Sequence, residues 1–411
     1  MNILVANWTW YPSGGDWTYV ENITRQYIAH GHQIIPFSMQ DERNFSNAYS
    51  PFFISHIDYK KVNKASPGAA YKVIKTSIWS KEAQQQLEKL LDTVKIDFAH
   101  INVIHHYITP IILKILKERG IPVIWTLHEY TPICPESTFI SHGQICEKCK
   151  GGAFYHCITN KCKKGSLPAS LVAATENYVH AALNCYQYVD HYVCPSEFLY
   201  QKFRSFNFFP EKLVQLYHGY DYAEVESATR NLGPAPAQKY IVFAGRLEKI
   251  KGPYTLIKAV ANHPDIQLRL IGTGTQEAEL RQYVAEQQLT NVTFLGKLKR
   301  AETLKEIGNA TFLVCPSEWY EVLGFTVVEA MAMGKPVIGS AIGAIPEMVI
   351  EGKTGMLFPH GDVTVLSGRI RELYDRPEQI EEMGKNAKTH IHNLINSEKH
   401  YAGLQKLIPG L

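Results

Sequence analysis

The sequence lacks several features that would assign it to a class at once. No stretch reaches the ~20 consecutive apolar residues that a membrane-spanning helix needs. The first residues, MNILVANW, lack the charged region and long apolar core of a signal peptide. A formal net charge of +3 is too small to indicate nucleic-acid binding. We therefore expect a cytoplasmic protein. Any anion-binding site must come from a local arrangement of residues and not from the overall charge.

Instead, the chain has the composition and length of a globular protein with more than one domain. It has 411 residues, of which 45% are hydrophobic and 20% are charged. Over residues 2–223, short apolar runs alternate with helical stretches, and the same alternation restarts after an Ala-, Pro- and Gly-rich stretch. Strands are expected at 3–7, 33–37, 97–102 and 122–128, and then at 240–245, 268–272, 292–296, 311–317 and 335–340.

The fold class predicted from this alternation is α/β, with two doubly wound Rossmann-like domains. We expect one domain over 1–225, a linker over 226–238, a second domain over 239–395 and a closing helical segment over 396–411. Ligands of such sheets bind beyond the carboxyl ends of the strands, so two facing domains would form a cleft there.

One stretch, residues 317–334, combines a predicted helix with two carboxylates. We expect a loop that ends at Gly324, a helix directly after it and a stop at Gly334. Glu321 then lies at the mouth of the helix and Glu329 lies inside it. Free backbone N–H groups at such an end favour phosphate, and carboxylates accept hydrogen bonds from sugar hydroxyls, so a nucleotide-sugar suits both. The alternative is a surface helix with two solvated glutamates.

Two cations follow the first strand of the second predicted domain. Arg246 comes directly after Gly245, and Lys251 follows five residues later, so both side chains can converge on one point. A leaving nucleoside diphosphate accumulates negative charge, which many enzymes neutralise with a metal held by an Asp-x-Asp motif, and the sequence has no such motif. We predict that Arg246 and Lys251 stabilise this charge directly, with two solvated cations as the alternative.

Several short motifs follow one another along the chain: Gly14-Gly15, His128, Pro195-Ser196, Gly245-Arg246, Lys251-Gly252, Gly272-x-Gly274, Pro316-Ser317, Glu321 and Glu329. This ordered set resembles glycosyltransferase family 4, whose members are retaining, metal-independent enzymes with the GT-B fold. The resemblance covers nearly the whole chain. It implies two Rossmann-like domains that face each other across a cleft, and a C-terminal helix that crosses back to the N-terminal domain.

The resemblance also implies roles for individual residues. Arg246 and Lys251 would bind the donor diphosphate. Glu329 would hold the ribose hydroxyls, and Glu321 would contact the transferred sugar. His128 would lie near that sugar as a neutral imidazole, although its local sequence alone fits a structural histidine better. The other donor-binding positions implied are Gly14, Gly15, Gly245, Gly272, Gly274, Lys297, Leu298, Gly324, Phe325 and Thr326.

The acceptor side is predicted from polar residues that follow neighbouring strands. Glu129 would orient a neighbour or hold acceptor hydroxyls, and four polar residues after the preceding strand would line the same side. A helix cap or an exposed face would explain some of them. The four polar residues are His100, Asn102, His105 and His106.

The predicted reaction is a same-face displacement with retention, in which the leaving phosphate takes the acceptor's proton.

Five of the eight cysteines lie close together in the first domain. Cys146, Cys149, Cys157 and Cys162 form two close pairs, a spacing that favours a structural zinc in a reducing compartment. The alternatives are reduced thiols that pack a loop and an unexpected disulfide pair. Lysines surround these cysteines and recur over 60–79, where a solvated face or a weak contact with an anionic membrane surface would explain them.

We therefore predict a retaining hexosyltransferase that moves a sugar from a UDP- or GDP-sugar to a glycan or lipid-linked glycan, in envelope or exopolysaccharide synthesis. It would need no metal for catalysis, bind no nucleic acid and work in the cytoplasm, with optional peripheral contact to the cytoplasmic face of the membrane. Two rivals fit the same motifs. One is another GT-B nucleotide-sugar chemistry, such as an epimerase. The other is a non-catalytic, zinc-stabilised subunit of a polysaccharide assembly complex.

Overall fold

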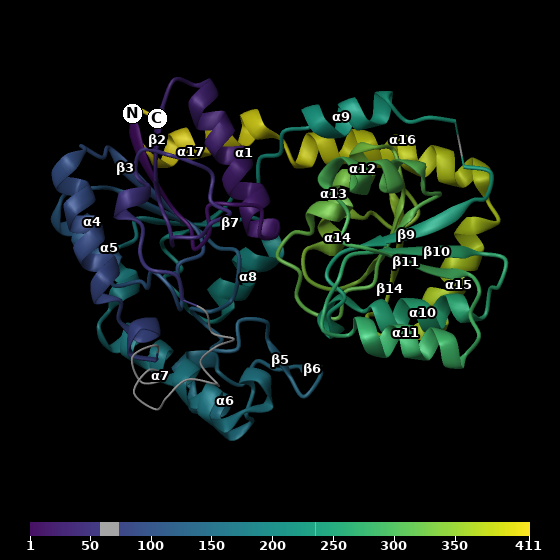
Figure 1. Cartoon of the computed structure of the whole chain (residues 1–411), viewed down its shortest axis with the longest axis horizontal. Helices are drawn as coiled ribbons and strands as arrows, with labels where there is room; N and C mark the ends of the chain where they lie inside the picture. Colours follow the sequence, from purple (N-terminus) through teal and green to yellow (C-terminus); the bar gives the residue numbers. More distant parts are fainter. Residues whose placement is uncertain (58–73, 235) are drawn as a thin grey trace. The chain divides into compact units, whose positions relative to one another are not determined.

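The computed structural model describes residues 1–57, 74–234 and 236–411. They form two compact units, one of residues 1–220 with 397–411 and the other of residues 221–396. Each unit is built on a six-stranded parallel sheet with helices on both faces (Figure 1). This architecture confirms the predicted α/β class with two Rossmann-like sheets.

The N-terminal unit carries the sheet with the order β2-β1-β3-β4-β7-β8. The order reverses direction at β1, so right-handed connections place α1 on one face and α4 and α5 on the other (Figure 1). The strands are β1 (Asn2–Ala6), β2 (Gln33–Phe37), β3 (Phe98–Ile101), β4 (Val123–Thr126), β7 (His191–Cys194) and β8 (Leu213–Gln215). The helices are α1 (Gly15–Ala29), η1 (Ser50–Phe52), α4 (Lys81–Thr93), α5 (Ile112–Glu118), η4 (Cys185–Tyr188) and α8 (Glu197–Ser205).

The final helix of the chain, α17 (Ser397–Leu407), belongs to the N-terminal unit and packs beside α1, so the two ends of the chain lie near each other (Figure 1). Gln26 of α1 donates a hydrogen bond to the carbonyl of Ser397 at 2.6 Å. His400 is buried, and its Nε2 lies 2.9 Å from the hydroxyl of Tyr19. The predicted return of the C-terminal helix to the N-terminal domain is therefore confirmed.

The C-terminal unit carries the sheet with the order β11-β10-β9-β12-β13-β14. Helices α10 and α11 cover one face, and α12, α13 and α14 cover the other (Figure 1). The strands are β9 (Tyr240–Ala244), β10 (Gln267–Ile271), β11 (Val292–Gly296), β12 (Leu313–Cys315), β13 (Val337–Ser340) and β14 (Gly355–Phe358). The helices are α9 (Ala223–Arg230), η5 (Lys249–Lys251), α10 (Pro253–Ala261), α11 (Glu277–Glu286), α12 (Arg300–Asn309), α13 (Phe325–Ala332), α14 (Ile345–Met348), α15 (Val363–Tyr374) and α16 (Pro377–Leu394).

The segment predicted as a linker, 226–238, differs from the structure in its first part. Residues 226–230 are the second half of α9, which packs on α12 and buries Val225. The Gly and Pro residues that suggested a linker begin only after this helix, whereas the sequence of α9 itself is rich in good helix formers.

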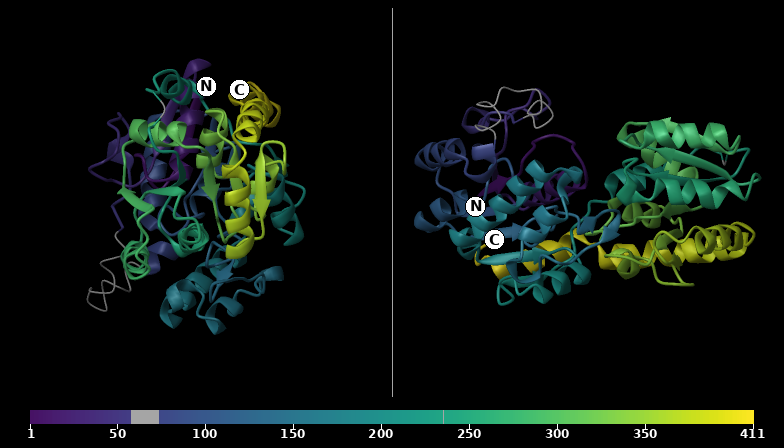
Figure 2. Two further views of the ribbon diagram at one scale, coloured as in Figure 1. Left: turned by 90° about the vertical axis from the view of Figure 1, so that its right-hand side faces the viewer. Right: turned by 90° about the horizontal axis from the view of Figure 1, so that it is seen from below.

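The cysteine-rich segment forms a small lobe of the N-terminal unit (Figures 1 and 2). Before α7 (Leu167–Ala182) it contains only short elements, packed on a small core around Phe154, Cys149 and Cys157. The short elements are β5 (Ile140–Ser141), β6 (Gln144–Ile145), η2 (Lys150–Gly152), α6 (Tyr155–Thr159) and η3 (Lys163–Gly165).

No helix in the described part of the chain is long and apolar enough to cross a membrane.

Candidate active site

The strand order of the C-terminal unit defines its binding edge. From β9 the chain adds β10 and β11 on one side, and then returns to the other side of β9 to add β12, β13 and β14. The topological switch therefore lies between β9 and β12. Ligands of open α/β sheets bind beyond the carboxyl ends of the strands at such a switch. Gly245 and Arg246 follow β9, and Ser317 and Glu321 follow β12, so the predicted phosphate and sugar residues share this edge.

Glu321 is a buried carboxylate with two close partners. Its Oε1 lies 2.6 Å from Lys251 Nζ and accepts a hydrogen bond from Ser317 Oγ at 2.5 Å. Burial opposes its ionisation, but the Lys251 ammonium and the Ser317 hydroxyl outweigh burial and hold the pKa of Glu321 below its ordinary value. Lys251 also lies over the ring of Trp319, at 5.0 Å from the centroid. The structure thus brings Lys251 and Glu321 together as an ion pair.

The backbone of Glu321 is fixed by a glycine whose role the sequence did not reveal. Gly343 has φ +61°, and a Cβ there would lie 2.3 Å from the backbone nitrogen of Glu321. The next residue, Ala344, donates its backbone N–H to the carbonyl of Glu321 at 2.9 Å. The segment after β13 therefore holds the Glu321 loop at a distance that only glycine allows.

Helix α13 starts at Phe325, directly after Gly324, and ends at Ala332, which confirms the predicted helix. Its Glu329 is 3% exposed, and Oε1 lies 2.6 Å from Arg300 Nη1. Arg300 is the first residue of α12 and was not predicted as a site residue, because only the folded chain brings α12 to α13.

Arg300 also connects two groups of predicted donor-binding residues. Lys297 and Leu298 form the loop between β11 and α12, two to three positions before Arg300. Lys297 and Leu298, which are predicted to contact the base, therefore lie close in sequence to Arg300. Arg300 in turn forms an ion pair with Glu329, which is predicted to hold the ribose.

Arg246 differs from Lys251 in its surroundings. It is exposed and has no ion-pair partner among the residues that the structure describes.

Gly272 is required by the fold of the neighbouring loop, because it has φ +128° and a Cβ there would lie 1.9 Å from the carbonyl oxygen of Gly245. The backbone N–H of Leu247 bonds to the carbonyl of Thr273 at 3.0 Å, so the loops after β9 and β10 pack directly on each other.

In the N-terminal unit the switch lies between β1 and β3. Gly14 is the N-cap residue of α1 and Gly15 its first residue, both in the connection that follows β1. His128 follows β4, is half-buried, and has its Nε2 3.0 Å from Oδ1 of Asn102, which follows β3. Burial lowers the pKa of His128 to about 3, against a smaller opposite effect of Glu129, so the imidazole is neutral at physiological pH.

A buried cluster of rings surrounds Tyr19 of α1. Its ring lies 4.0 Å from the ring of His218 and 5.1 Å from the ring of His128, measured between centroids. Burial lowers the pKa of His400 to about 4, and burial with two neighbouring histidines lowers that of His100 to about 3. The cluster joins residues far apart in the sequence, so no local pattern predicted it.

The four polar residues predicted to line the acceptor side are mostly interior. His100, Asn102 and His105 are at most 2% exposed, which corrects the expectation that they line a surface; His106 alone is partly exposed. The buried imidazoles are held by internal hydrogen bonds instead. His105 lies 3.1 Å from Glu129 Oε1 and 3.1 Å from the hydroxyl of Tyr186. Burial raises the pKa of Glu129, but the hydrogen bond to His105 and the nearby imidazoles of His105 and His106 together outweigh burial and bring the pKa to about 2.

All eight cysteines are free thiols. Five of them line one cavity of about 10 Å³: Cys134, Cys146, Cys149, Cys157 and Cys162. In the described residues, no three His, Cys, Asp or Glu side chains are placed to hold a metal ion together. The structure therefore gathers the predicted zinc ligands around one point without arranging them as a finished site.

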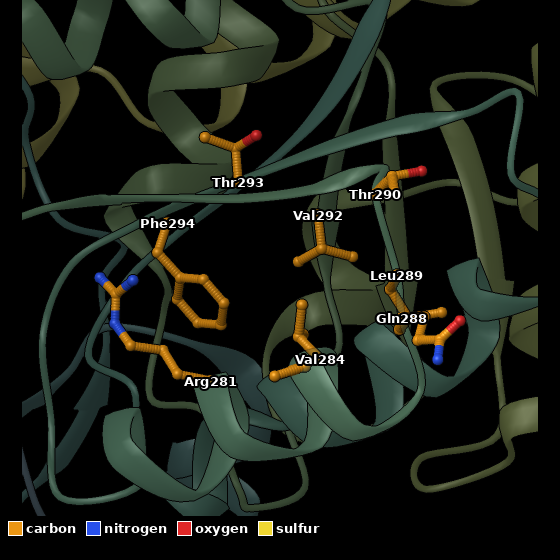
Figure 3. Close-up of a pocket in the computed structure, with 9 residues that line it drawn as sticks. Arg281, Val284, Gln288, Leu289, Thr290, Val292, Thr293 and Phe294 are labelled. Atoms are coloured by element: carbon orange, nitrogen blue, oxygen red, sulfur yellow. The ribbon is translucent and has the colours of Figure 1, made fainter.

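A larger hollow lies elsewhere in the C-terminal unit, between α11 and β11 (Figure 3). It has a volume of about 550 Å³ and is lined by apolar side chains such as Val284, Leu289 and Val292. Arg281 lies over the ring of Phe294 at its rim, 4.5 Å from the centroid (Figure 3). None of the predicted donor-binding residues lines this hollow.

Known proteins share both halves of this arrangement. The family described as Glycosyltransferase Family 4 matches residues 13–224, and that described as Glycosyl transferases group 1 matches residues 225–390. A GDP-mannose-dependent monoacylated alpha-(1-6)-phosphatidylinositol monomannoside mannosyltransferase of Corynebacterium glutamicum is 35% identical over 179 residues, which cover 41% of this chain and 46% of that protein. The chain spans less than half the length of the curated relatives it matches.

Solved structures match over nearly the whole chain. The sucrose-phosphate synthase of Thermosynechococcus elongatus has a TM-score of 0.74 at 20% identity and covers 99% of this chain and 98% of its own. Anabaena HepE in complex with UDP has a TM-score of 0.65 at 17% identity, with both chains covered in full. At these identities the structures establish the shared fold alone. The match to the family described as Glycosyltransferase Family 4, however, spans more than half of the chain. The chain therefore belongs to glycosyltransferase family 4.

Proposed function

We propose that this protein is a retaining glycosyltransferase that moves a sugar from a nucleotide-sugar to a glycan or lipid-linked glycan acceptor, in envelope or exopolysaccharide synthesis. The observation that carries the proposal is the pair of buried, cation-paired carboxylates Glu321 and Glu329, which follow β12, together with the exposed Arg246, which follows the neighbouring strand β9. Relatives whose names give GDP-mannose or UDP as ligand make UDP- and GDP-sugars the first donors to test.

The charges of the C-terminal unit suit a leaving diphosphate. Arg246 is exposed and without an ion pair in the described chain, and Lys251 neutralises Glu321 until a phosphate competes for it. The start of α13 adds the positive end of its helix dipole. These groups would stabilise the negative charge without a metal ion. Glu321 would contact the transferred sugar and Glu329 the ribose hydroxyls, while the neutral His128 of the N-terminal unit would hydrogen-bond to that sugar.

A transfer assay tests this proposal. The protein is incubated with UDP-glucose, UDP-galactose, UDP-N-acetylglucosamine or GDP-mannose, and release of the nucleoside diphosphate is measured with and without a panel of glycan acceptors. We expect acceptor-dependent release from one donor that Arg246→Ala abolishes and Arg281→Ala leaves intact. Conversion of a donor without any acceptor would favour an epimerase, and no turnover of any donor would favour the non-catalytic subunit.

The predicted structural zinc at Cys146, Cys149, Cys157 and Cys162 is a separate part of the proposal. Its support is the shared cavity of about 10 Å³, room for a single ion, in a lobe with little other core. Lysines on both sides of Cys149 and Cys162 would offset the charge of four thiolates. Metal binding would have to draw the thiols inward. Protein purified without chelator should contain one zinc per chain, and its absence would remove this idea.

We also propose that the same lobe makes the peripheral contact with an anionic membrane surface. Leu167 and Leu171 of α7 are 49% and 51% exposed on one helix face, and Lys161 and Lys164 lie just before them. Most of the predicted basic stretch 60–79 lies outside the described residues. Flotation with phosphatidylcholine vesicles that contain phosphatidylglycerol should be lost when both leucines become serine. Val365→Ser in the C-terminal unit is the control, and no binding by the wild type would contradict the contact.

A further inference from the structure

His128, the histidine proposed to meet the transferred sugar, has one hydrogen bond within the described chain. Its Nε2 lies 3.0 Å from Oδ1 of Asn102. A neutral imidazole has one nitrogen that donates and one that accepts, and only the partners decide which is which. The chemistry that His128 offers a ligand therefore depends on what Asn102 presents to it.

The orientation of the Asn102 amide follows from a second contact. Asn102 is 1% exposed, and its backbone N–H donates to the carbonyl of Ala6 at 2.9 Å. Its side-chain Nδ2 lies 3.5 Å from the same carbonyl oxygen, which can only accept. A flipped amide would place Oδ1 against this oxygen, two acceptors face to face in a buried place. The amide oxygen of Asn102 therefore faces His128.

The protonation of His128 then follows by elimination. The Asn102 Oδ1 atom has no hydrogen, so the hydrogen between the two residues belongs to His128 Nε2. The ring is neutral, because burial lowers the pKa of His128 to about 3, and a neutral ring carries a single hydrogen. Nδ1 is left with a lone pair as the remaining polar atom of a half-buried ring.

We propose that Asn102 is a positioning residue that holds His128 as the Nε2–H tautomer, so that His128 meets its ligand through Nδ1 as a hydrogen-bond acceptor. The ligand step rests on the proposed function. At the position it contacts, His128 would accept a hydrogen from a sugar hydroxyl and would disfavour a carboxylate, since two acceptors would meet. The donor class is therefore a sugar with a free hydroxyl at that position, not the corresponding uronic acid.

The tautomer can be observed directly by long-range ¹H–¹⁵N correlation of the histidine rings in the intact protein at neutral pH. Two other buried histidines serve as internal references, because carbonyl oxygens only accept. His180 Nε2 lies 2.8 Å from the carbonyl of Ile78, which fixes the Nε2–H form. His400 Nδ1 lies 2.6 Å from the carbonyl of Tyr217, which fixes the Nδ1–H form. The His128 signal is assigned by its loss in His128→Gln.

We expect the His128 pattern to match that of His180. Asn102→Asp should keep this pattern and raise the pKa of His128, because a carboxylate also accepts and adds negative charge. Asn102→Leu should give a mixture of tautomers. A His128 pattern like that of His400 in the wild type, or an unchanged pattern in Asn102→Leu, would overturn the proposal.

Two controls separate this proposal from loss of the fold and from the proposed function. Unfolding temperatures identify a variant that fails to fold, and the near-isosteric Asn102→Asp then carries the test. Thermal shifts with UDP and GDP report on the C-terminal unit and should not change in either Asn102 variant. If no nucleotide binds the wild type, the proposed function fails while the tautomer result still stands on its own.

Discussion

The two units place their candidate residues at equivalent points but use different chemistry there. In both sheets the residues follow strands at or next to the topological switch: β1, β3 and β4 in one, and β9 and β12 in the other. The C-terminal unit has buried carboxylates with cationic partners, whereas the N-terminal unit has buried neutral imidazoles joined to hydroxyl and amide groups. The edge of the C-terminal unit is thus prepared for changes of charge, whereas that of the N-terminal unit offers neutral imidazoles for hydrogen bonding beside one ionised carboxylate, Glu129.

This difference matches the two ends of a glycosyl transfer. A departing nucleoside diphosphate gains charge, so cations positioned next to it lower the barrier. Sugar hydroxyls stay neutral throughout the reaction, and a neutral imidazole can hydrogen-bond to them without a change of protonation. The comparison predicts measurable differences between the two units.

The largest expected effect is on transfer, from Arg246→Ala. Removing one electrostatic contact to a developing charge typically costs ~3–4 kcal/mol of barrier, a loss of roughly two to three orders of magnitude in rate. Because Arg246 is exposed, the melting temperature should not change. Arg281→Ala, another exposed arginine of the same unit, is the matched control. Near-normal turnover in Arg246→Ala would break the assignment of the charged edge.

The second effect is on stability, from Lys251→Met. Glu321 has only 6% of its side chain exposed, and loss of its cation leaves a buried carboxylate unpaired. Such a loss costs about 3 kcal/mol of unfolding free energy. The double variant Lys251→Met/Glu321→Gln should recover most of it, as urea unfolding would measure. Equal destabilisation by the single and double variants would show that the pair is not the cause.

The third effect is a pH dependence specific to the neutral unit. The pKa of His400 is lowered from 6.5 to about 4 by burial, so the unfolded chain takes up its proton first. Its contribution to stability is full above pH 6.5 and is lost as the pH falls towards 4, at about 1.4 kcal/mol per pH unit. His400→Gln should reduce this slope by the share of one proton, because His100 and His128 also have pKa values lowered by burial and keep their contributions. His360→Gln, at an exposed residue of the other unit, should leave the slope unchanged.

Tryptophan fluorescence is a suitable probe for this measurement, because five of the six tryptophans lie in the N-terminal unit. Glu321 does not confuse the result, because it is present in both the wild type and His400→Gln and its contribution cancels in the comparison. The same slope in His400→Gln as in the wild type would mean that the buried His400 does not contribute to acid stability.

The smallest effect concerns ribose recognition. Glu329→Gln should weaken nucleoside diphosphate binding by about 1 kcal/mol, roughly fivefold, because a neutral amide accepts weaker hydrogen bonds than a carboxylate. Pyrophosphate has no ribose, so its affinity should not fall. Calorimetric titration with both ligands makes the comparison. Equal losses for the two would place Glu329 at the phosphates and not at the sugar.

Sequence reasoning reached the features that depend on local pattern. Continuous apolar runs predicted β2 and β11 in full, and Gly324 predicted the start of α13. The short strands β7, β8 and β14 gave no usable pattern. The two-sheet fold followed from the alternation of strand-like and helical stretches, and the structure confirms it. The family followed from the order of the motifs, and the matches to known families confirm it.

What the sequence could not reveal are contacts between distant residues. Arg300 meets Glu329 only because α12 packs on α13, and Tyr19 gathers histidines from β3 to α17. The buried state of His105 depends on Tyr186, far along the chain. These partners decide which polar residues are exposed to a ligand and which are interior, and no spacing rule contains that information.

The most direct test of the central claim is nucleotide binding to the charged edge of the C-terminal unit. Thermal shifts are measured with UDP, GDP, ADP and CMP in the presence of chelator, on the wild type, Arg246→Ala and Arg281→Ala. The account predicts metal-independent stabilisation by one nucleoside diphosphate that Arg246→Ala loses and Arg281→Ala keeps. Stabilisation that survives in Arg246→Ala, or that requires a divalent metal, would contradict it.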